Sequence, residues 1–227
     1  VPSWVGLIMP LEAQGYESTG AGRLTTLLDD FSPDRALGYG ADACKLLLPY
    51  RVDHAESAAH QDALVISTAA ACHEVGLPLV IEPTVYRQPT ESTEAYSGAY
   101  ERLVIDAVAR LQPLGADVLK LPFPVLELSA TTEAAAQDAC RALAGACADT
   151  PWVLLGAGAE VATFVEQIRL AGTAGASGFL AGRGIWGAAI AGAPAETERI
   201  ARLVCLPALE RCREMAEQVA QPLHIAG

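Results

Sequence analysis

Six short apolar runs recur along the chain and constrain its fold more than any other feature. They begin 26 to 38 residues apart, are nearly continuous in Val, Leu and Ile, and occupy residues 4–10, 42–49, 78–84, 116–122, 151–156 and 177–182. Runs that do not alternate with polar residues are typical of strands covered on both faces of a parallel sheet. The sequence therefore predicts six buried parallel strands.

Helical patterns fill the segments between these runs. Apolar residues recur there at three- and four-residue spacing, in chain segments rich in Ala, Glu, Leu and Arg at 56–76, 98–114, 132–148, 159–174 and 196–220. A βα order repeated six times predicts an α/β architecture, either a doubly wound open sheet or a barrel. Charged residues follow several of the strands, which favours the barrel because a (β/α)8 barrel builds its site there; they are Glu12, Lys45, Arg51, Glu82, Arg87, Lys120 and Arg183.

The last helical segment carries many charges, which are best explained as its solvated face. The pattern predicts that Leu203, Leu206, Leu209 and Val219 are buried and that Cys205 and Cys212 are packing residues.

Composition and charge limit the partners and the compartment. The 227 residues are 52% hydrophobic and 19% charged, as in globular proteins, and the net charge of −12 disfavours a nucleic-acid partner. Six cysteines without a C-x-x-C pair predict reduced thiols and a cytoplasmic protein. The longest weakly charged stretch, 177–193, contains Arg183 and five glycines, so no membrane span is predicted.

The lysine count is the most informative number in the composition. Of 15 basic residues only Lys45 and Lys120 are lysines, and both lie within predicted buried strands. Desolvation and a neighbouring cation each favour a neutral amine, which can attack a ketone to form a Schiff base, whereas arginine cannot. The alternative is a strand-end lysine whose ammonium reaches solvent or pairs with a carboxylate. Two such lysines together favour the nucleophile.

Glu82 has a similar position, since it follows four apolar strand residues and precedes Pro83. It could be a buried partner of an arginine. Beside an amine nucleophile it is a candidate general acid and base, because carbon–carbon cleavage through an imine requires proton transfer to and from a substrate hydroxyl. Val80 and Glu82 share one strand face, as do Val118 and Lys120, and this function requires both charged side chains to point inward.

Glycine turns follow the last two predicted strands. Gly156-Ala157-Gly158 follows one strand and Gly182-Arg183-Gly184 follows the next. Their backbone N–H groups could hold a phosphate, with Arg183 as a bidentate donor. Ordinary tight turns are the main alternative. A dinucleotide fingerprint is disfavoured because Val161 replaces its third glycine.

The four histidines form no metal-binding pattern. His54, His60, His73 and His224 make neither H-x-H nor H-E-x-x-H. We therefore predict neither a metal nor another cofactor.

A family resemblance follows from these motifs taken together. The segments GLIMPLEAQGYE, RLTTLLDDFSPDRALGYGADACKLLLPYRVD, LPLVIEPTVYR, GADVLKLPFP, PWVLLGAG and GASGFLAGRGIW occur in this order from Gly6 onward. The chain resembles class I aldolases of the tagatose-bisphosphate aldolase type and their sulfofructose-phosphate aldolase relatives. The resemblance implies a TIM (β/α)8-type barrel as a single domain over residues 1–227, and metal-independent cleavage of a phosphorylated ketose to dihydroxyacetone phosphate and an aldehyde.

The resemblance also implies residue roles. The imine-forming lysine of the family falls on Lys120, its strand glutamate on Glu82, and its second strand lysine on Lys45. The A-G-R arginine that binds phosphate or sulfonate falls on Arg183. The implied substrate-binding residues are Arg183, Gly182, Gly158, Ala157, Gly156, Arg51 and Glu12.

The chain departs from the family pattern at three places. Pro122 stands where the family usually has Glu, Gly156 and Ala157 stand where it has a serine pair or Ser-Ala, and the first two βα units are absent. Six strands cannot close a barrel alone. Either an N-terminal part is missing from this chain, which we favour, or another chain covers the open edges of a short variant.

The sequence predicts a small-molecule partner, a sugar phosphate or sulfosugar phosphate, and a possible homo-oligomer. Two alternatives to this aldolase stay open. One is a transaldolase-like transfer or another imine-based aldol reaction on the same barrel. The other is a module that binds sugar phosphates without catalysis.

Overall fold

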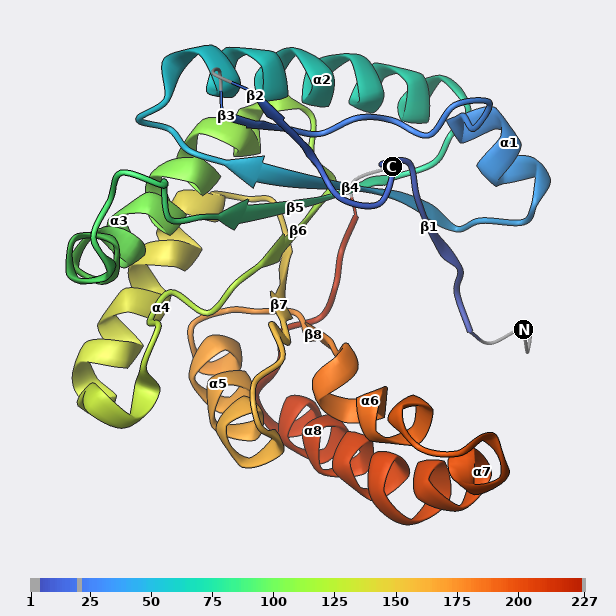
Figure 1. The fold of residues 1–227 in the computed structure, drawn as a ribbon, viewed down its shortest axis with the longest axis vertical. Helices are drawn as coiled ribbons and strands as arrows, with labels where there is room; N and C mark the ends of the chain where they lie inside the picture. Colours follow the sequence, from blue (N-terminus) through green and yellow to red (C-terminus); the bar gives the residue numbers. More distant parts are fainter. Residues whose placement is uncertain (1–4, 20–21, 226–227) are drawn as a thin grey trace. The chain divides into compact units, whose positions relative to one another are not determined.

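The computed structural model of the chain in Figure 1 describes residues 5–19 and 22–225. Each of the six apolar runs contains a strand, which confirms the predicted α/β architecture. These strands are β1 (Ile8–Pro10), β4 (Ala43–Tyr50), β5 (Leu79–Val85), β6 (Val118–Leu121), β7 (Trp152–Leu155) and β8 (Phe179–Leu180).

The five predicted helical segments also contain helices. These are α2 (Ala55–Glu74), α3 (Thr93–Leu111), α4 (Glu133–Cys147), α5 (Val161–Thr173) and, in the last segment, α7 (Thr197–Ile200) and α8 (Leu206–Val219). A π-helical turn, η4 (Ala201–Cys205), separates α7 from α8. Pro207 lies in the first turn of α8 and has no N–H to donate to the preceding turn, so a regular α-helical ladder cannot continue through this point.

Several short elements have no counterpart in the prediction. They are the hairpin strands β2 (Glu17–Thr19) and β3 (Gly22–Leu24), the helices α1 (Pro33–Gly38) and α6 (Arg183–Ala191), and the 3-10 turns η2 (Leu128–Ala130) and η3 (Pro194–Glu196). A further 3-10 turn, η1 (Gln112–Leu114), ends the predicted helical segment 98–114. Two glycines, Gly184 and Gly187, and the lack of any charged residue after Arg183 obscure the helical pattern of α6.

The chain divides into two units. Among the described residues, the first unit comprises the chain up to Lys120 together with 145–151 and Ile225, and the second comprises Leu121–Ala144 and Trp152–His224. The chain therefore passes from one unit to the other within β6 and within α4.

The sheet of the first unit positions the predicted catalytic residues. Its order is β1-β4-β5-β6, and each neighbouring pair is parallel. Helices α2 and α3 pack on it, α2 against β4 and β5 and α3 against β5 (Figure 1). Alternate residues turn toward these helices and are fully buried: Leu46, Leu48, Tyr50, Leu79, Ile81 and Leu119. Burying a side chain of this size contributes about 1.5–3 kcal/mol to the free energy of folding. Because side chains alternate along a strand, the residues between these buried ones point to the other face of the sheet.

The second unit contains the parallel pair β7 and β8 and the packed helices α5 and α8. Cys205 and Cys212 are buried, as predicted, and Val219 is half-buried. The predicted burial of Leu203, Leu206 and Leu209 is wrong, since these residues are 66%, 49% and 40% exposed. The seven-residue spacing of the two cysteines sets the inward face of the helix. Because Leu206 and Leu209 fall beside that face and Leu203 lies on the π-helical turn, their side chains reach solvent.

Candidate active site

Four charged side chains from three strands and one loop meet in the first unit. The Nζ of Lys120 on β6 lies 3.0 Å from Oε2 of Glu82 on β5, and the Nζ of Lys45 on β4 lies 3.3 Å from the same oxygen. Lys45 also donates a hydrogen bond to Oε1 of Glu12, which follows β1. The result is an unbroken series of alternating charges, Glu12, Lys45, Glu82 and Lys120.

Strand register brings these residues together. Lys45 is opposite Val80, and Val80 is opposite Val118, so the residues two positions further along β5 and β6 are Glu82 and Lys120. Since side chains alternate between sheet faces, the three charged groups share the face turned away from α2 and α3. The predicted inward direction of Glu82 and Lys120 agrees with this geometry.

The cluster is enclosed but reachable. The side chains of Lys45 and Lys120 are 17% and 15% exposed, and those of Glu12 and Glu82 are 10% and 6% exposed. Charges in such a place are stabilised only when they are paired and hydrogen-bonded, and each lysine here touches a carboxylate. The second oxygen of Glu12, Oε2, is buried and has no hydrogen-bond partner among the described residues. This oxygen can therefore accept a hydrogen bond from a polar ligand.

The glycine turns come together in the second unit. The N–H of Gly156 donates to the carbonyl of Leu180, which joins the ends of β7 and β8. Ala157 and Gly158 both have positive φ, at 42° and 79°. A Cβ on Gly184 would lie 2.7 Å from the carbonyl oxygen of Ala159, so this contact requires glycine.

Arg183 begins helix α6, with Gly182 as its N-cap. Its side chain is exposed, and the N–H groups of a first helical turn have no partner within the helix. The start of this helix lies beside the turn 156–158, since a Cβ on Gly156 would be 3.5 Å from the backbone N of Gly182 and one on Gly184 would be 3.5 Å from the backbone of Gly158. The positive end of the helix dipole and these N–H groups suit an anion. The five predicted residues Gly156, Ala157, Gly158, Gly182 and Arg183 thus lie in one place.

Arg51 has a different environment from the one predicted for a substrate-binding residue. It is 3% exposed, and its guanidinium makes a two-point contact with Asp53, two hydrogen bonds to Glu91 and one to the carbonyl of Tyr86. All five N–H donors are used within the protein. Arg51 therefore ties the loop after β4 to the segment after β5, and it has no free donor for a substrate. Arg87 likewise donates to a backbone carbonyl, that of Glu91.

Replacing Arg51 with methionine is expected to lower the free energy of unfolding by about 2–4 kcal/mol. The loss of a buried partner leaves two carboxylates uncompensated, and the partial exposure of Asp53 places the effect at or below the usual range for a buried pair. Urea unfolding measures it. The matched control is Arg213→Met, which removes an exposed pair with Glu217 and should cost less than about 0.5 kcal/mol. Equal losses in the two variants would contradict the assigned role.

The same cluster predicts a dependence of stability on pH. Hydrogen bonds from Arg51 hold the pKa of Asp53 and the pKa of Glu91 below their usual values of about 4. A depressed folded-state pKa adds stability above the unfolded-state pKa, and this stability is lost as the pH falls through the folded-state pKa. The difference in unfolding free energy between the wild-type protein and Arg51→Met should therefore shrink as the pH is lowered from about 6 to below about 4. A difference of the same size at both ends would show that these two carboxylates do not cause it.

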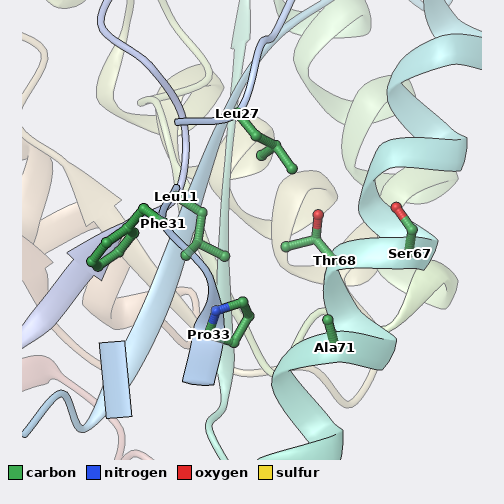
Figure 2. Close-up of a pocket in the computed structure, with 7 residues that line it drawn as sticks. All are labelled: Leu11, Leu27, Phe31, Pro33, Ser67, Thr68 and Ala71. Carbon is green, nitrogen blue, oxygen red and sulfur yellow. The ribbon is translucent and has the colours of Figure 1, made fainter. Parts of the chain in front are cut away.

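A cavity lies in the first unit beside α2. Figure 2 shows its mostly apolar lining, which comes from the segment between β1 and α1, from the first residue of α1 and from α2: Leu11, Leu27, Phe31, Pro33, Ser67, Thr68 and Ala71. Its volume is about 110 Å³. None of the four charged residues lines it, so we do not assign the reaction to this cavity.

Two negative findings concern metals and membranes. Within residues 5–19 and 22–225, no three His, Cys, Asp or Glu side chains are grouped so that they could bind a metal ion. None of the helices in the same residues combines the length and apolar character needed to cross a bilayer.

Sequence reasoning missed the hairpin of β2 and β3 and the residue it presents, Arg23. The side chain of Arg23 lies between the rings of Tyr16 and Tyr86. A signal was present in the sequence, because Gly20, Ala21 and Gly22 form a turn-like run between short segments of mixed polarity. Its link to Tyr86, 63 residues away, is not visible in the sequence.

Curated relatives are 30% to 32% identical to this chain over the aligned residues. A tagatose 1,6-diphosphate aldolase of Enterococcus faecalis is 30% identical over 195 residues, covering 80% of this chain and 60% of its own length. A second one from that organism is 32% identical over 200 residues, and the enzyme of Lactococcus lactis subsp. lactis is 30% identical over 213. The chain spans about 60% of the length of these relatives, from 59% to 65%.

Solved structures show the same fold. A Schiff-base-forming fructose-1,6-bisphosphate aldolase matches 95% of this chain and 72% of its own, with a TM-score of 0.61 and 19% identity. An archaeal fructose 1,6-bisphosphate aldolase matches 95% and 71%, with a TM-score of 0.61 and 18% identity. The fold is thus similar to the TIM-barrel structures of class I aldolases, as predicted.

The family assignment follows from sequence over most of the chain. Residues 3–188 match the profile of the DeoC/LacD family aldolases, a range that includes the strands, the charged cluster and both glycine turns. This chain belongs to the DeoC/LacD aldolase family.

Proposed function

We propose that the protein is a class I aldolase in which Lys120 forms an imine with a phosphorylated ketose. The observation that carries this proposal is the shared oxygen of Glu82, which lies 3.0 Å from Nζ of Lys120 and 3.3 Å from Nζ of Lys45. An amine nucleophile needs a nearby base to take its proton, and a carboxylate at hydrogen-bond distance fits that role.

The reaction can be written with these groups alone. Glu82 takes a proton from the Lys120 ammonium, and the neutral amine attacks C2 of the ketose to give a carbinolamine. Glu82 returns its proton to the hydroxyl, which leaves as water, and the carboxylate is restored. The positive charge of the resulting iminium ion draws the electrons of the C3–C4 bond toward nitrogen. Glu82 accepts the proton of the C4 hydroxyl as the bond breaks and the aldehyde leaves. The remaining enamine is protonated at C3, and water releases dihydroxyacetone phosphate and restores the amine.

Lys45 and Glu12 support these steps. Lys45 lies between two carboxylates and keeps a positive charge beside Glu82, which stabilises negative charge that develops on substrate oxygens. The unpartnered Oε2 of Glu12 can accept a hydrogen bond from a substrate hydroxyl. Both residues thus serve substrate positioning in this proposal.

The second unit, taken by itself, has a group of residues that we predict to bind an anion. The first turn of α6, the glycine turn 156–158 and Arg183 supply N–H donors and positive charge that suit a terminal phosphate or sulfonate. The curated relatives are named tagatose 1,6-diphosphate aldolases, and this supports a ketose phosphate as the substrate. A sulfosugar phosphate, a cytoplasmic location and a homo-oligomer are further predictions of this proposal.

Borohydride trapping tests the proposal directly. The full chain is incubated with dihydroxyacetone phosphate and treated with borohydride, which reduces an imine to a stable secondary amine. Peptide mass spectrometry should find the adduct on Lys120. Its absence from Lys120, at ligand concentrations that stabilise the protein against heat, would favour binding without imine chemistry and overturn the proposal.

A further inference from the structure

Arg23 is held between two aromatic rings on the β2–β3 hairpin of the first unit. Its guanidinium carbon lies 4.6 Å from the centre of the Tyr16 ring and 4.4 Å from the centre of the Tyr86 ring. Both distances are in the range of a cation–π contact. The two ring contacts together restrict the position of the guanidinium.

The guanidinium donors of Arg23 remain available to a ligand. Arginine has five N–H donors in the plane of the group, and none of those of Arg23 makes a hydrogen bond within the described residues. Across residues 5–19 and 22–225 the structure gives this side chain no carboxylate partner, in contrast to Arg51 and Arg110, which pair with Asp53 and Asp62. Arg23 is thus a cation that contacts two aromatic rings and has no acidic partner among the described residues.

The hairpin arm that carries Arg23 is fixed at several points. The N–H of Arg23 donates to Oη of Tyr86 at 3.2 Å, and the hydroxyl of Thr25 donates to the carbonyl of Leu47 on β4 at 2.8 Å. Gln61 on α2 donates to the same hydroxyl at 3.1 Å. Gly22 has φ of 100°, and a Cβ there would lie 3.0 Å from Oη of Tyr86. The position of Arg23 is therefore set before any ligand binds.

Two routes give the same distance from the charged cluster. Tyr86 follows Glu82 by four residues, and Arg23 lies four residues along the hairpin arm from Leu27, which is paired with Glu12. Four extended residues span roughly 13 Å. The backbone of Arg23 thus lies about this far from the charged cluster, toward the carboxyl ends of the strands. The side chain of Arg23 and a six-carbon sugar with a terminal anion can together span that distance.

We infer that Arg23 binds the anionic group at the end of the ketose that is farther from the imine carbon. This inference rests on the proposed function. Lys120 attacks C2, so the far end is C6, and the free edge of the guanidinium matches two oxygens of a phosphate or sulfonate. Tyr16 and Tyr86 are the positioning residues that hold the guanidinium of Arg23. The phosphate at C1 then binds to donors other than Arg23.

Paired substrates isolate this contact. Steady-state cleavage is measured for a ketose 1,6-bisphosphate, for the 6-deoxy-6-sulfo ketose 1-phosphate and for the ketose 1-phosphate, which lacks the far anion. Arg23→Gln should lower kcat/KM roughly 10- to 100-fold for the substrate with the preferred far anion, mainly through KM, and less than about 2-fold for the 1-phosphate. The kcat/KM of Arg23→Lys should lie between those of the wild-type protein and Arg23→Gln, since lysine keeps the positive charge but lacks the two-point N–H donor arrangement of the guanidinium. The two anionic substrates distinguish phosphate from sulfonate.

Controls separate this inference from the proposed function. Arg102→Gln removes an equal charge from the exposed face of α3 and should change none of these values. Arg23→Gln should still give the borohydride adduct of dihydroxyacetone phosphate on Lys120, which reports an intact site. Equal losses on all three substrates, or no loss on any, would overturn the role of Arg23 while the aldolase proposal stands. A wild-type protein without adduct or turnover would overturn both.

Discussion

Replacing Lys120 with arginine is expected to reduce turnover on the order of 10³-fold or more and to abolish the borohydride adduct. Arginine keeps the positive charge that faces Glu82, so the charged cluster stays balanced. It does not lose its proton in a protein and cannot form the imine. The loss therefore reports the chemistry of the amine, and a residual activity within about 10-fold of wild type would contradict the proposal.

Lys45→Arg is the matched control for that variant. It retains a cation between Glu12 and Glu82, and the adduct should still form on Lys120. Reduced and digested samples of the wild-type protein and both variants are compared by peptide mass spectrometry. An adduct on Lys45 in the Lys120→Arg protein would exchange the roles of the two lysines.

The central part of this site could be predicted from sequence because it depends on local pattern. Lys45, Glu82 and Lys120 lie in continuous apolar runs, and such runs identify buried parallel strands. Period-two alternation then gives the face of each residue. Register was not visible in the sequence, and the observed pairing of Lys45 with Val80 and of Val80 with Val118 supplies it.

The rest depends on partners far apart in the chain. The sequence predicts that Arg51 binds substrate, but in the structure its guanidinium pairs with Glu91, 40 residues along the chain. This ion pair joins two loops of the protein. Both a substrate and a carboxylate would suit an arginine at a strand end, so sequence could not decide between them. Arg23 is similar, because its role depends on Tyr86 and on a short hairpin whose strands are three residues each.

Replacing Glu82 with glutamine is the second change with a large expected effect. The substitution keeps the volume of the side chain and its place on β5, but it removes the only carboxylate that touches both lysines among the described residues. Loss of a positioned general acid and base costs roughly 10²- to 10⁴-fold in rate. We expect kcat for ketose cleavage to fall by that factor, while KM changes by less than about 5-fold.

The step affected by Glu82→Gln can be separated from simple loss of the fold. Exchange of the C3 protons of dihydroxyacetone phosphate with deuterated water, followed by NMR, measures enamine formation without an aldehyde, and it should slow along with cleavage. Glu101→Gln removes an equal charge from an exposed position on α3 and should leave both rates and the melting temperature unchanged. A Glu82→Gln protein that melts like wild type and exchanges C3 protons at the wild-type rate would remove Glu82 from enamine formation and leave Lys45 or Glu12 to move that proton.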